Sequence, residues 1–320
     1  MTQHVLICDD SRLASKQLAR SLPADWQAEI HFAAHGREAL AHLQQIPTDL
    51  LFLDLNMPEM DGYTVLKHLQ HQPFAPKIIV VSADIQAEAH RRVMDLGALD
   101  FLRKPIGPAQ LQDALQRYQL FEPGQLFQHR LSQVGIDDAL RELCNVAMGQ
   151  AAASMSQVLG AFIELPIPKL RRLHGNELEM LLAASFRDPE LMMLSQGFIG
   201  HGISGEAIVL LQRGSYQTVG TLLGIDNLAQ EQGRLEVQME LGNLLFSAFL
   251  SGLGEQLNIP FCQSHPVLVR EAPACQFSNS TLAVEISYRL TEQDILCDLL
   301  LLLPQSSLPR LEQSLSFLME

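Results

Sequence analysis

The first third of the chain alternates short apolar runs with longer stretches in which apolar residues recur at helical spacing. The apolar runs occupy residues 5–7, 50–53 and 78–81, and a further short strand is expected at 100–102. The helical patterns occupy residues 12–21, 36–45, 63–71 and 87–97. Short apolar runs bounded by polar residues are typical of buried strands in a parallel sheet. The alternation of strands and helices therefore predicts a doubly wound α/β sheet.

Each apolar run is followed by residues that can carry chemistry. Asp9 and Asp10 follow the first run, Asp54 the second and Ser82 the third, and Lys104 follows the further short strand at 100–102. In doubly wound sheets, ligands bind beyond the carboxyl ends of the strands, where the connections diverge. We therefore expect these five side chains to line one site.

The residue types in this set indicate phosphoryl chemistry on a carboxylate. Three clustered carboxylates repel one another unless a hard divalent cation neutralises them, and Mg²⁺ accepts a few carboxylates while keeping waters for a phosphate. Asp54 is then a plausible nucleophile toward a phosphoryl group, which gives an aspartyl phosphate. Ser82 and Lys104 are placed to hold the new phosphoryl oxygens.

This part of the chain resembles the response regulator receiver domains of the CheY type, over about residues 1–121. The matching elements are Asp9-Asp10, the run Asp-Leu-Asn-Met-Pro-Glu-Met-Asp-Gly at 54–62, Ser82-Ala83 and Lys104-Pro105. Each element alone is common in loops, but all of them in this order are highly specific. The resemblance implies a CheY-like (βα)5 fold.

The resemblance also implies roles for individual residues. Asp54 would accept phosphate from a chemotaxis histidine kinase, with Mg²⁺ held by Asp9, Asp10, Asp54 and the backbone carbonyl of Asn56. Phe101 occupies the position of the aromatic switch residue, three positions before the lysine. Asn56 and Asp84 stand where the family tunes the lifetime of the phosphate.

Seven histidines are scattered through the same region without a metal-like spacing. We interpret them as surface or edge residues rather than ligands: His4, His31, His35, His42, His68, His71 and His90.

The rest of the chain, from about residue 134, has a pattern that occurs twice. Long helical patterns at 136–160 and 235–257 each precede strand-like runs and a final helix. The strand-like runs lie around 180–186, 192–198 and 207–211 in the first half, and near 267–270, 282–289 and 295–303 in the second. The closing helices are expected at 215–223 and 307–317. This layout predicts an α+β domain of two halves related by internal duplication.

Both long helices carry the same row of polar residues. The copies are Asp138, Glu142, Asn145 and Pro168, then Glu236, Glu240, Asn243 and Pro266, at a constant offset of 98. Spacings of four and then three return side chains to one helix face. Each long helix is therefore expected to present two carboxylates and one carboxamide in a short row, followed by a proline 23 residues after the asparagine.

Such a row can act on an aspartyl phosphate in another protein. Hydrolysis needs in-line attack by water, and the catalyst contributes mostly positioning and electrostatics. A carboxamide offers both a donor and an acceptor, so Asn145 or Asn243 can hold a water at a defined angle. A carboxylate one turn away, Glu142 or Glu240, can pair with the lysine that a receiver keeps beside its phosphate.

The row resembles the signature of the CheC, CheX and FliY chemotaxis phosphatases, which is Asp or Ser, then Glu, Asn and Pro at these spacings. The first copy matches at every position, whereas Glu236 departs from the Asp or Ser expected in the second. The resemblance covers about residues 134–320 and implies dephosphorylation of phosphorylated CheY. Asp138 and Glu236 would support the helix or the docked partner, and the receptor deamidase CheD is a further partner of the family.

Taken alone, Glu-x-x-Asn on an amphipathic helix usually marks a solvated face. Asn243, flanked by Gly242 and a pair of leucines, also suits a buried polar group at a helix contact. The matching prolines and the duplication favour the functional interpretation.

Length and composition agree with two domains in a reducing compartment. The 320 residues suggest a receiver at 1–121, a linker at 122–133 and a second domain at 134–320. Five cysteines without a C-x-x-C pair favour a cytoplasmic protein. We expect neither a signal peptide nor a transmembrane span, because no suitable apolar run is present.

Charge argues against nucleic acid as a partner. Residues 1–133 hold 12 Lys+Arg and 15 Asp+Glu, a net charge of −3, and residues 134–320 hold 10 and 21, a net charge of −11. The acidic second part repels phosphates but suits a partner that presents lysine near its own site.

The leading hypothesis is a chemotaxis response regulator whose output domain hydrolyses the aspartyl phosphate of a CheY-type receiver and is regulated through Asp54. The alternative is a non-catalytic adaptor that binds CheD or phosphorylated CheY when Asp54 is phosphorylated. Hydrolysis of the chain's own Asp54 phosphate is a third option. The sequence leaves open which receiver is the substrate, whether Asp54 phosphorylation activates or inhibits, whether both rows work, and the oligomeric state.

Overall fold

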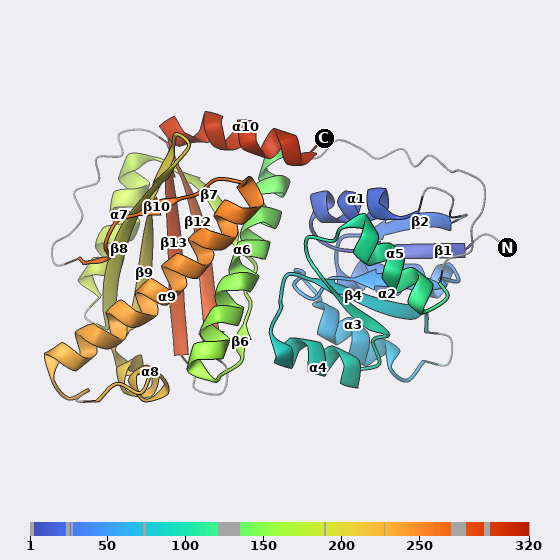
Figure 1. Cartoon of the computed structure of the whole chain (residues 1–320), viewed down its shortest axis with the longest axis horizontal. Coiled ribbons are helices and arrows are strands. Elements are labelled where there is room, and N and C mark those ends of the chain that lie inside the picture. The colour runs from blue at the N-terminus through green and yellow to red at the C-terminus, as the bar shows by residue number, and fades with distance from the viewer. Residues whose placement is uncertain are drawn as a thin grey trace. The chain divides into compact units, whose positions relative to one another are not determined.

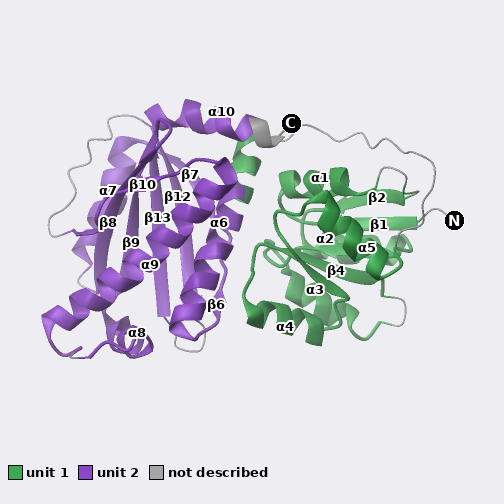
Figure 2. Ribbon diagram, in the orientation of Figure 1, with its two compact units in different colours: residues 1–142, 319 green, residues 143–318, 320 purple. Residues whose placement is uncertain are grey.

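The computed structural model describes residues 3–23, 26, 28–72, 75–120, 135–188, 190–226, 228–269, 280–290 and 295–319. The chain divides into two compact units, residues 1–142 and residues 143–318 (Figure 2). The division falls inside the helix that starts at Ile136, slightly later than the boundary expected near residue 134. The expected linker at 122–133 lies outside the described residues.

The first unit is built on a five-stranded parallel sheet with the order β2-β1-β3-β4-β5 (Figure 1). Its strands are β1 (Gln3–Cys8), β2 (Ala28–Ala33), β3 (Leu50–Leu53), β4 (Lys77–Ser82) and β5 (Asp100–Arg103). Its helices are α1 (Arg12–Ser21), α2 (Gly36–Gln45), α3 (Gly62–Leu69), α4 (Ala87–Asp95) and α5 (Pro108–Arg117). The predicted doubly wound (βα)5 fold is confirmed, because strands and helices alternate and the order reverses beside β1.

The two faces of this sheet pack into two separate hydrophobic cores. Val5 and Ile7 point into one core and Leu6 into the other, as the two-residue period of a strand requires. The three residues are almost completely buried. The central strands therefore read as continuous apolar runs, because both of their faces are covered.

β2 is the strand that the apolar runs did not reveal. Its sequence, Ala-Glu-Ile-His-Phe-Ala, is buried only at its two ends, and Glu29 and Phe32 are exposed. β2 lies at the edge of the sheet and pairs with β1 alone. An edge strand needs less apolar surface than a central one, so its pattern is weaker.

The second unit contains an eight-stranded sheet whose path runs β10-β8-β9-β13-β12-β6, with β11 paired to β8 and β7 paired to β12. The first half comprises α6 (Ile136–Leu159), β6 (Ile163–Glu164), β7 (Lys169–Leu173), α7 (Gly175–Arg187), β8 (Leu191–Gly200), β9 (Ile203–Gln212) and α8 (Tyr216–Leu222). The second half comprises α9 (Glu231–Leu257), β10 (Cys262–Gln263), β11 (Val267–Leu268), β12 (Thr281–Leu290), β13 (Ile295–Pro304) and α10 (Leu308–Met319). The two long helices, α6 and α9, cross one face of this sheet in opposite directions (Figure 1).

Strand pairing confirms the predicted duplication. β9 and β13 pair antiparallel at the centre, where Ile208 lies opposite Leu300, each the sixth residue of its own strand. The short strands of each half pair with a long strand of the other half. β6 and β7 of the first half pair with β12, and β10 and β11 of the second half pair with β8. Equivalent strands thus meet across a pseudo-twofold axis that passes between β9 and β13.

One expected strand is wrong. Residues 180–186 belong to helix α7, which runs from Gly175 to Arg187. Leu178 and Leu182 are its buried residues, four positions apart, and the side chain of Glu177 accepts a hydrogen bond from the backbone N–H of His174 at 2.9 Å. A short apolar run fits a strand or a buried helix face equally well, and the cap before the run decides for the helix.

Among the described residues, no helix combines the length and the apolar character that a membrane crossing requires.

Candidate functional site

Three carboxylates meet at the carboxyl ends of β1 and β3. Asp9 and Asp10 directly follow β1, and Asp54 directly follows β3. One oxygen from each of the three residues lies within 4.8 Å of the others. The two strands are neighbours in the parallel sheet, which brings residues 45 positions apart into one cluster. The predicted clustering of these residues is therefore present in the structure.

Local backbone contacts hold two of the carboxylates in place. The Asp9 side chain accepts a hydrogen bond from the backbone N–H of Ser11 at 2.9 Å, and the Asp54 side chain accepts one from Leu55 at 2.8 Å. Gly62 packs directly against the carbonyl of Asp54, so that a Cβ at this position would lie 2.2 Å from the carbonyl oxygen. Only glycine permits this approach, which explains the glycine at the end of the 54–62 run.

Burial and mutual repulsion shift the titration of this cluster. Burial is the main cause that raises the pKa of Asp9 and of Asp54 above their usual range. Burial, followed by the charge of Asp9, raises the pKa of Asp10 to about 7. Three carboxylates that resist ionisation in such a small space call for a compensating cation.

The donor set fits Mg²⁺. All three side chains offer hard carboxylate oxygens, and Oδ1 of Asp10 is buried without a hydrogen-bond partner among the described residues. A hard cation of this kind prefers oxygen ligands and keeps part of its water shell for a phosphate. Asn56, whose carbonyl was expected to contribute, is half-buried two residues after Asp54.

Lys104 supplies the positive charge within the cluster. Its Nζ lies 2.7 Å from Oδ2 of Asp9 and 3.4 Å from Oδ2 of Asp54. Burial on its own lowers the pKa of Lys104, but the carboxylates of Asp54 and Asp9 outweigh burial and raise this pKa well above its usual range. The ammonium group stays charged beside Asp54, as a ligand for phosphoryl oxygens must.

The remaining predicted residues lie on the neighbouring strands. Ser82 ends β4 and is fully buried, and its Oγ accepts a hydrogen bond from the backbone N–H of Asp84 at 3.1 Å. Phe101 is half-buried on β5, with its ring edge-on to that of His90 at a centroid distance of 5.5 Å. Ser82 thus comes from the strand next to that of Asp54, and the ring of Phe101 contacts His90 on α4.

The two acid-acid-asparagine rows lie on equivalent helices of the duplicated fold. On α9, the side chains of Glu236, Glu240 and Asn243 are exposed. Val237 and Leu241, which directly follow the two glutamates, are buried. Asn243 is therefore not a buried polar group at a helix contact. Its neighbour Gly242 packs against strand β8 instead, since a Cβ there would lie 2.7 Å from the side chain of Leu194.

The first row lies near the start of α6. It comprises Asp138, Glu142 and Asn145. α6 and α9 meet where Gln150 donates a hydrogen bond to Glu255 at 3.1 Å. Each row lies on the N-terminal side of this contact on its own helix. Because the two helices run in opposite directions, the rows occupy two separate patches (Figure 1).

Known proteins resemble the first unit in sequence. Residues 5–116 match the family model described as response regulator receiver domain. The N-terminal unit is a receiver domain. A protein-glutamate methylesterase/protein-glutamine glutaminase of Rhodospirillum rubrum is 40% identical over 108 residues, which make up 33% of this chain and 29% of the relative. The chain thus spans less than a third of that relative's length, and the likeness concerns the receiver.

Two solved structures resemble parts of the chain. The chemotaxis response regulator CheY4 of Vibrio cholerae is 31% identical, over 37% of this chain and 98% of that one, with a TM-score of 0.31. FliY of Thermotoga maritima is 14% identical, over 57% of this chain and 96% of that one, with a TM-score of 0.44.

The receiver domain places the chain in two-component signalling. The structure also brings together side chains that sequence reasoning kept apart. His4, Glu29 and His31 form a compact group on β1 and β2. The spacing of these residues in the sequence gives no sign of it, because the pairing of β1 with β2 creates the group.

Proposed function

We propose that the second unit is a phosphatase for phosphorylated aspartate on a CheY-type receiver, and that phosphorylation of Asp54 regulates it. The observation that carries the proposal is the duplicated row. Two equivalent helices of a pseudo-twofold fold repeat the same acid, acid and asparagine at an offset of 98. Duplication of the fold explains why buried apolar positions repeat, because both halves need the same core. It does not explain why the exposed residues Glu240 and Asn243 repeat as well.

The chemistry of the row suits hydrolysis of an acyl phosphate. The Asn243 carboxamide accepts one hydrogen bond from an attacking water and donates another, which fixes the direction of attack. Glu240, one turn earlier, pairs with the lysine of the docked receiver. This pairing draws the lysine away from the phosphoryl group, which opens the phosphoryl group to water, and the Glu240 carboxylate neutralises the charge of the lysine. Glu142 and Asn145 would act in the same manner from α6.

The metal comes with the substrate. A receiver that carries a phosphoryl group holds Mg²⁺ in its own carboxylate cluster, and the metal stabilises charge on the phosphoryl oxygens. The row therefore needs no metal ligands of its own. Asp138 and Glu236, one turn before the catalytic glutamates, would contact the docked receiver or support the helix.

Charge supports a protein partner that presents lysine. Residues 134–320 carry a net charge of −11, from 10 Lys+Arg and 21 Asp+Glu, and Lys169 is their one lysine. Such a surface steers a basic site toward the rows and repels nucleic acid.

The receiver domain supplies the regulation. Asp54 would accept a phosphoryl group from a chemotaxis histidine kinase, with Lys104 and Ser82 holding the new oxygens. Kinase activity would then set the rate at which a second receiver loses its phosphate, which is a feedback on the signal. CheD is a further candidate partner of the same unit.

The test is the decay of phosphorylated CheY from the same cell, with and without catalytic amounts of the full chain. The double variant Asn145→Ala plus Asn243→Ala should lose at least ~100-fold of the acceleration, because the water is no longer oriented. Asn176→Ala is the matched control, since Asn176 is an exposed helical asparagine on α7 outside both rows. It should keep full activity.

Two results would count against the assignment. Full activity in the double variant would show that the asparagines do not orient the water. No acceleration by the wild-type chain, even with Asp54 phosphorylated, would favour a binding protein without turnover.

A further inference from the structure

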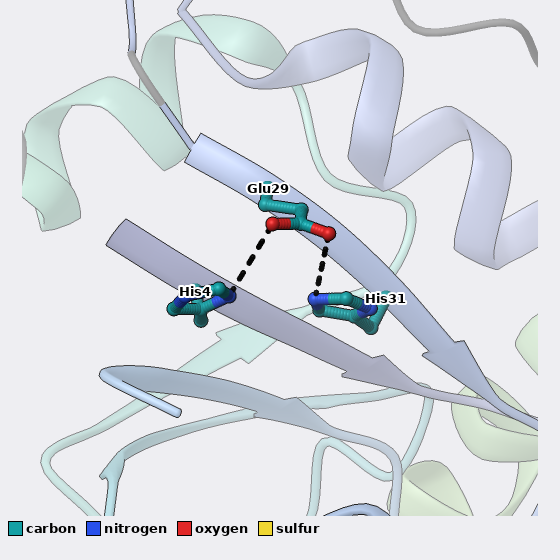
Figure 3. Close-up of side chains that lie close together, drawn as sticks. All are labelled: His4, Glu29 and His31. Atoms are coloured by element: carbon teal, nitrogen blue, oxygen red, sulfur yellow. Dashed lines mark ion pairs between the residues drawn. The ribbon is translucent and has the colours of Figure 1, made fainter. Parts of the chain in front are cut away.

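The His4–Glu29–His31 group joins two strands of the receiver (Figure 3). The Glu29 carboxylate lies between the two imidazoles: one oxygen is 3.7 Å from Nδ1 of His4 and the other is 3.7 Å from Nε2 of His31. One ligand atom from each of the three residues lies within 4.8 Å of the other two. The group therefore consists of two nitrogen donors and one oxygen donor that converge on a small volume.

The ring nitrogens of this group lack hydrogen bonds. Nδ1 of His4 and Nε2 of His31 are buried and have no hydrogen-bond partner among the described residues. His42 on α2 packs against His31 at a ring-centroid distance of 4.6 Å. Nε2 of His42 is likewise buried without a hydrogen-bond partner among the described residues. A buried polar atom without a partner costs free energy. Two such atoms, Nδ1 of His4 and Nε2 of His31, face the same Glu29 carboxylate, which indicates a ligand that they share.

We propose that the His4–Glu29–His31 group binds a divalent transition-metal ion of the Zn²⁺ type, with Nδ1 of His4, Nε2 of His31 and one oxygen of Glu29 as ligands. Two imidazoles and one carboxylate are a known zinc donor set that leaves a fourth position for water. Ligands about 2.0–2.2 Å from a tetrahedral ion lie roughly 3.4 Å apart. One ligand atom from each residue lies within 4.8 Å of the other two, so the three atoms would have to move closer together around the ion.

The strand pairing preorganises this arrangement. In the parallel register of β1 and β2, His4 lies opposite Glu29. Glu29 and His31 are two residues apart, so their side chains leave the same face of the sheet. Because the backbone rather than flexible side chains sets the geometry, binding an ion costs little conformational entropy.

The proposed site is separate from the carboxylate cluster in place and in chemistry. His4 lies near the start of β1 and Asp9 beyond its end, five residues or roughly 16 Å away at the rise of a strand. Imidazole nitrogen favours Zn²⁺, Cu²⁺ or Ni²⁺, whereas the three carboxylates of Asp9, Asp10 and Asp54 favour Mg²⁺. The receiver would then hold two different ions at opposite ends of one strand.

The rival explanation is a set of simple ion pairs between protonated histidines and Glu29. The Glu29 side chain is 58% exposed, and exposed ion pairs contribute little to stability. The two explanations differ in their response to metal, because protonated imidazoles do not bind Zn²⁺.

The experiment is calorimetric titration of the full chain with ZnCl₂ near neutral pH, in excess Mg²⁺ so that the carboxylate cluster is already filled. Wild-type protein should bind one more equivalent of Zn²⁺ than the double variant His4→Gln plus His31→Gln. Glu29→Gln should weaken this binding by more than ~100-fold, since even residues that only support metal ligands change affinity by about 10–100-fold. His71→Gln is the control, because His71 is exposed and belongs to no such group.

A second measurement guards against misfolding. Trp26 is the one tryptophan of the chain and is buried in the receiver, so its fluorescence follows the unfolding of that domain. Zn²⁺ should raise the midpoint of thermal unfolding in the wild type and in His71→Gln, and leave it unchanged in Glu29→Gln. Glu29 is exposed, so this variant should keep the fold. Equal Zn²⁺ binding in wild type and Glu29→Gln, or none in either, would overturn the proposal.

Discussion

At the scale of single residues, Asp84 is a buried carboxylate in the receiver whose ionisation destabilises the fold. Asp84 is buried just after β4, and its Oδ1 accepts hydrogen bonds from the backbone N–H and the side-chain amide of Gln86, both at 3.1 Å. Burial raises the pKa of Asp84 to about 6, and the hydrogen bonds from Gln86 only partly oppose this shift. The ionised carboxylate is therefore a cost to folding at neutral pH.

Replacement of Asp84 by Asn should remove that cost. Below about pH 4 the carboxyl is protonated in both the folded and unfolded states, so the pKa shift contributes nothing. Between about pH 4 and pH 6 the unfolded state ionises first and the folded wild type loses stability as pH rises; above the folded pKa the loss is complete. We expect Asp84→Asn to exceed the wild type in stability by roughly 2–3 kcal/mol above pH 6.

Urea unfolding followed by Trp26 fluorescence across this pH range checks the expectation. The difference between variant and wild type should be near zero at low pH and should then grow and level off. A difference that is independent of pH would mean that Asp84 does not titrate in this window.

At the scale of elements, the crossing of α6 and α9 depends on small side chains. A Cβ on Gly252 would lie 3.0 Å from Cα of Ala147 and 2.2 Å from the side-chain oxygen of Gln150. Gln150 can move, but the backbone of Ala147 cannot. Because the two helices pack closely at this point, α6 and α9, which carry the polar rows, stay in one layer over the sheet.

Replacement of Gly252 by Val should force the helices apart. Overpacking of this kind costs about 1–3 kcal/mol. Thermal unfolding followed by helical circular dichroism should show a lower midpoint for the transition of the second unit, with the Trp26 transition of the receiver unchanged. Gly214→Val is the control, because a Cβ there meets nothing within 4 Å. Equal midpoints for Gly252→Val and wild type would show that the crossing tolerates a side chain.

At the scale of the whole molecule, the chain carries both Asp54, the proposed phosphate acceptor, and a unit proposed to remove such phosphates. Asp54 in the receiver is therefore a potential substrate of the rows on α6 and α9. Small-molecule phosphodonors with Mg²⁺ allow Asp54 to be loaded without a kinase, so that its own dephosphorylation can be followed.

We expect the phosphate on Asp54 to decay faster in the wild-type chain than in Asn145→Ala plus Asn243→Ala, because only the wild type can orient the water. The dependence on protein concentration separates two routes. A rate that rises with concentration indicates that one chain acts on another, and a constant rate indicates hydrolysis within the chain. Identical decay in both proteins at every concentration would exclude Asp54 as a substrate. Asp54→Asn, which cannot be phosphorylated, gives the background.

The sequence by itself determined most of the architecture. Central strands of the receiver were visible because both of their faces are buried, and Asp9, Asp54 and Lys104 could be grouped because parallel strands end at one edge. The duplication was visible because the rows and prolines repeat at a constant offset. These features depend on local pattern and spacing, which a sequence carries directly.

Only the tertiary structure decided the rest. The edge strand β2 has no apolar run, and residues 180–186 fit a helix or a strand until the cap at His174 is considered. The exposure of Asn243 rests on how α9 packs against the sheet. The His4–Glu29–His31 group exists because β1 and β2 pair in one register, which brings together residues that lie 25 or more positions apart in the sequence.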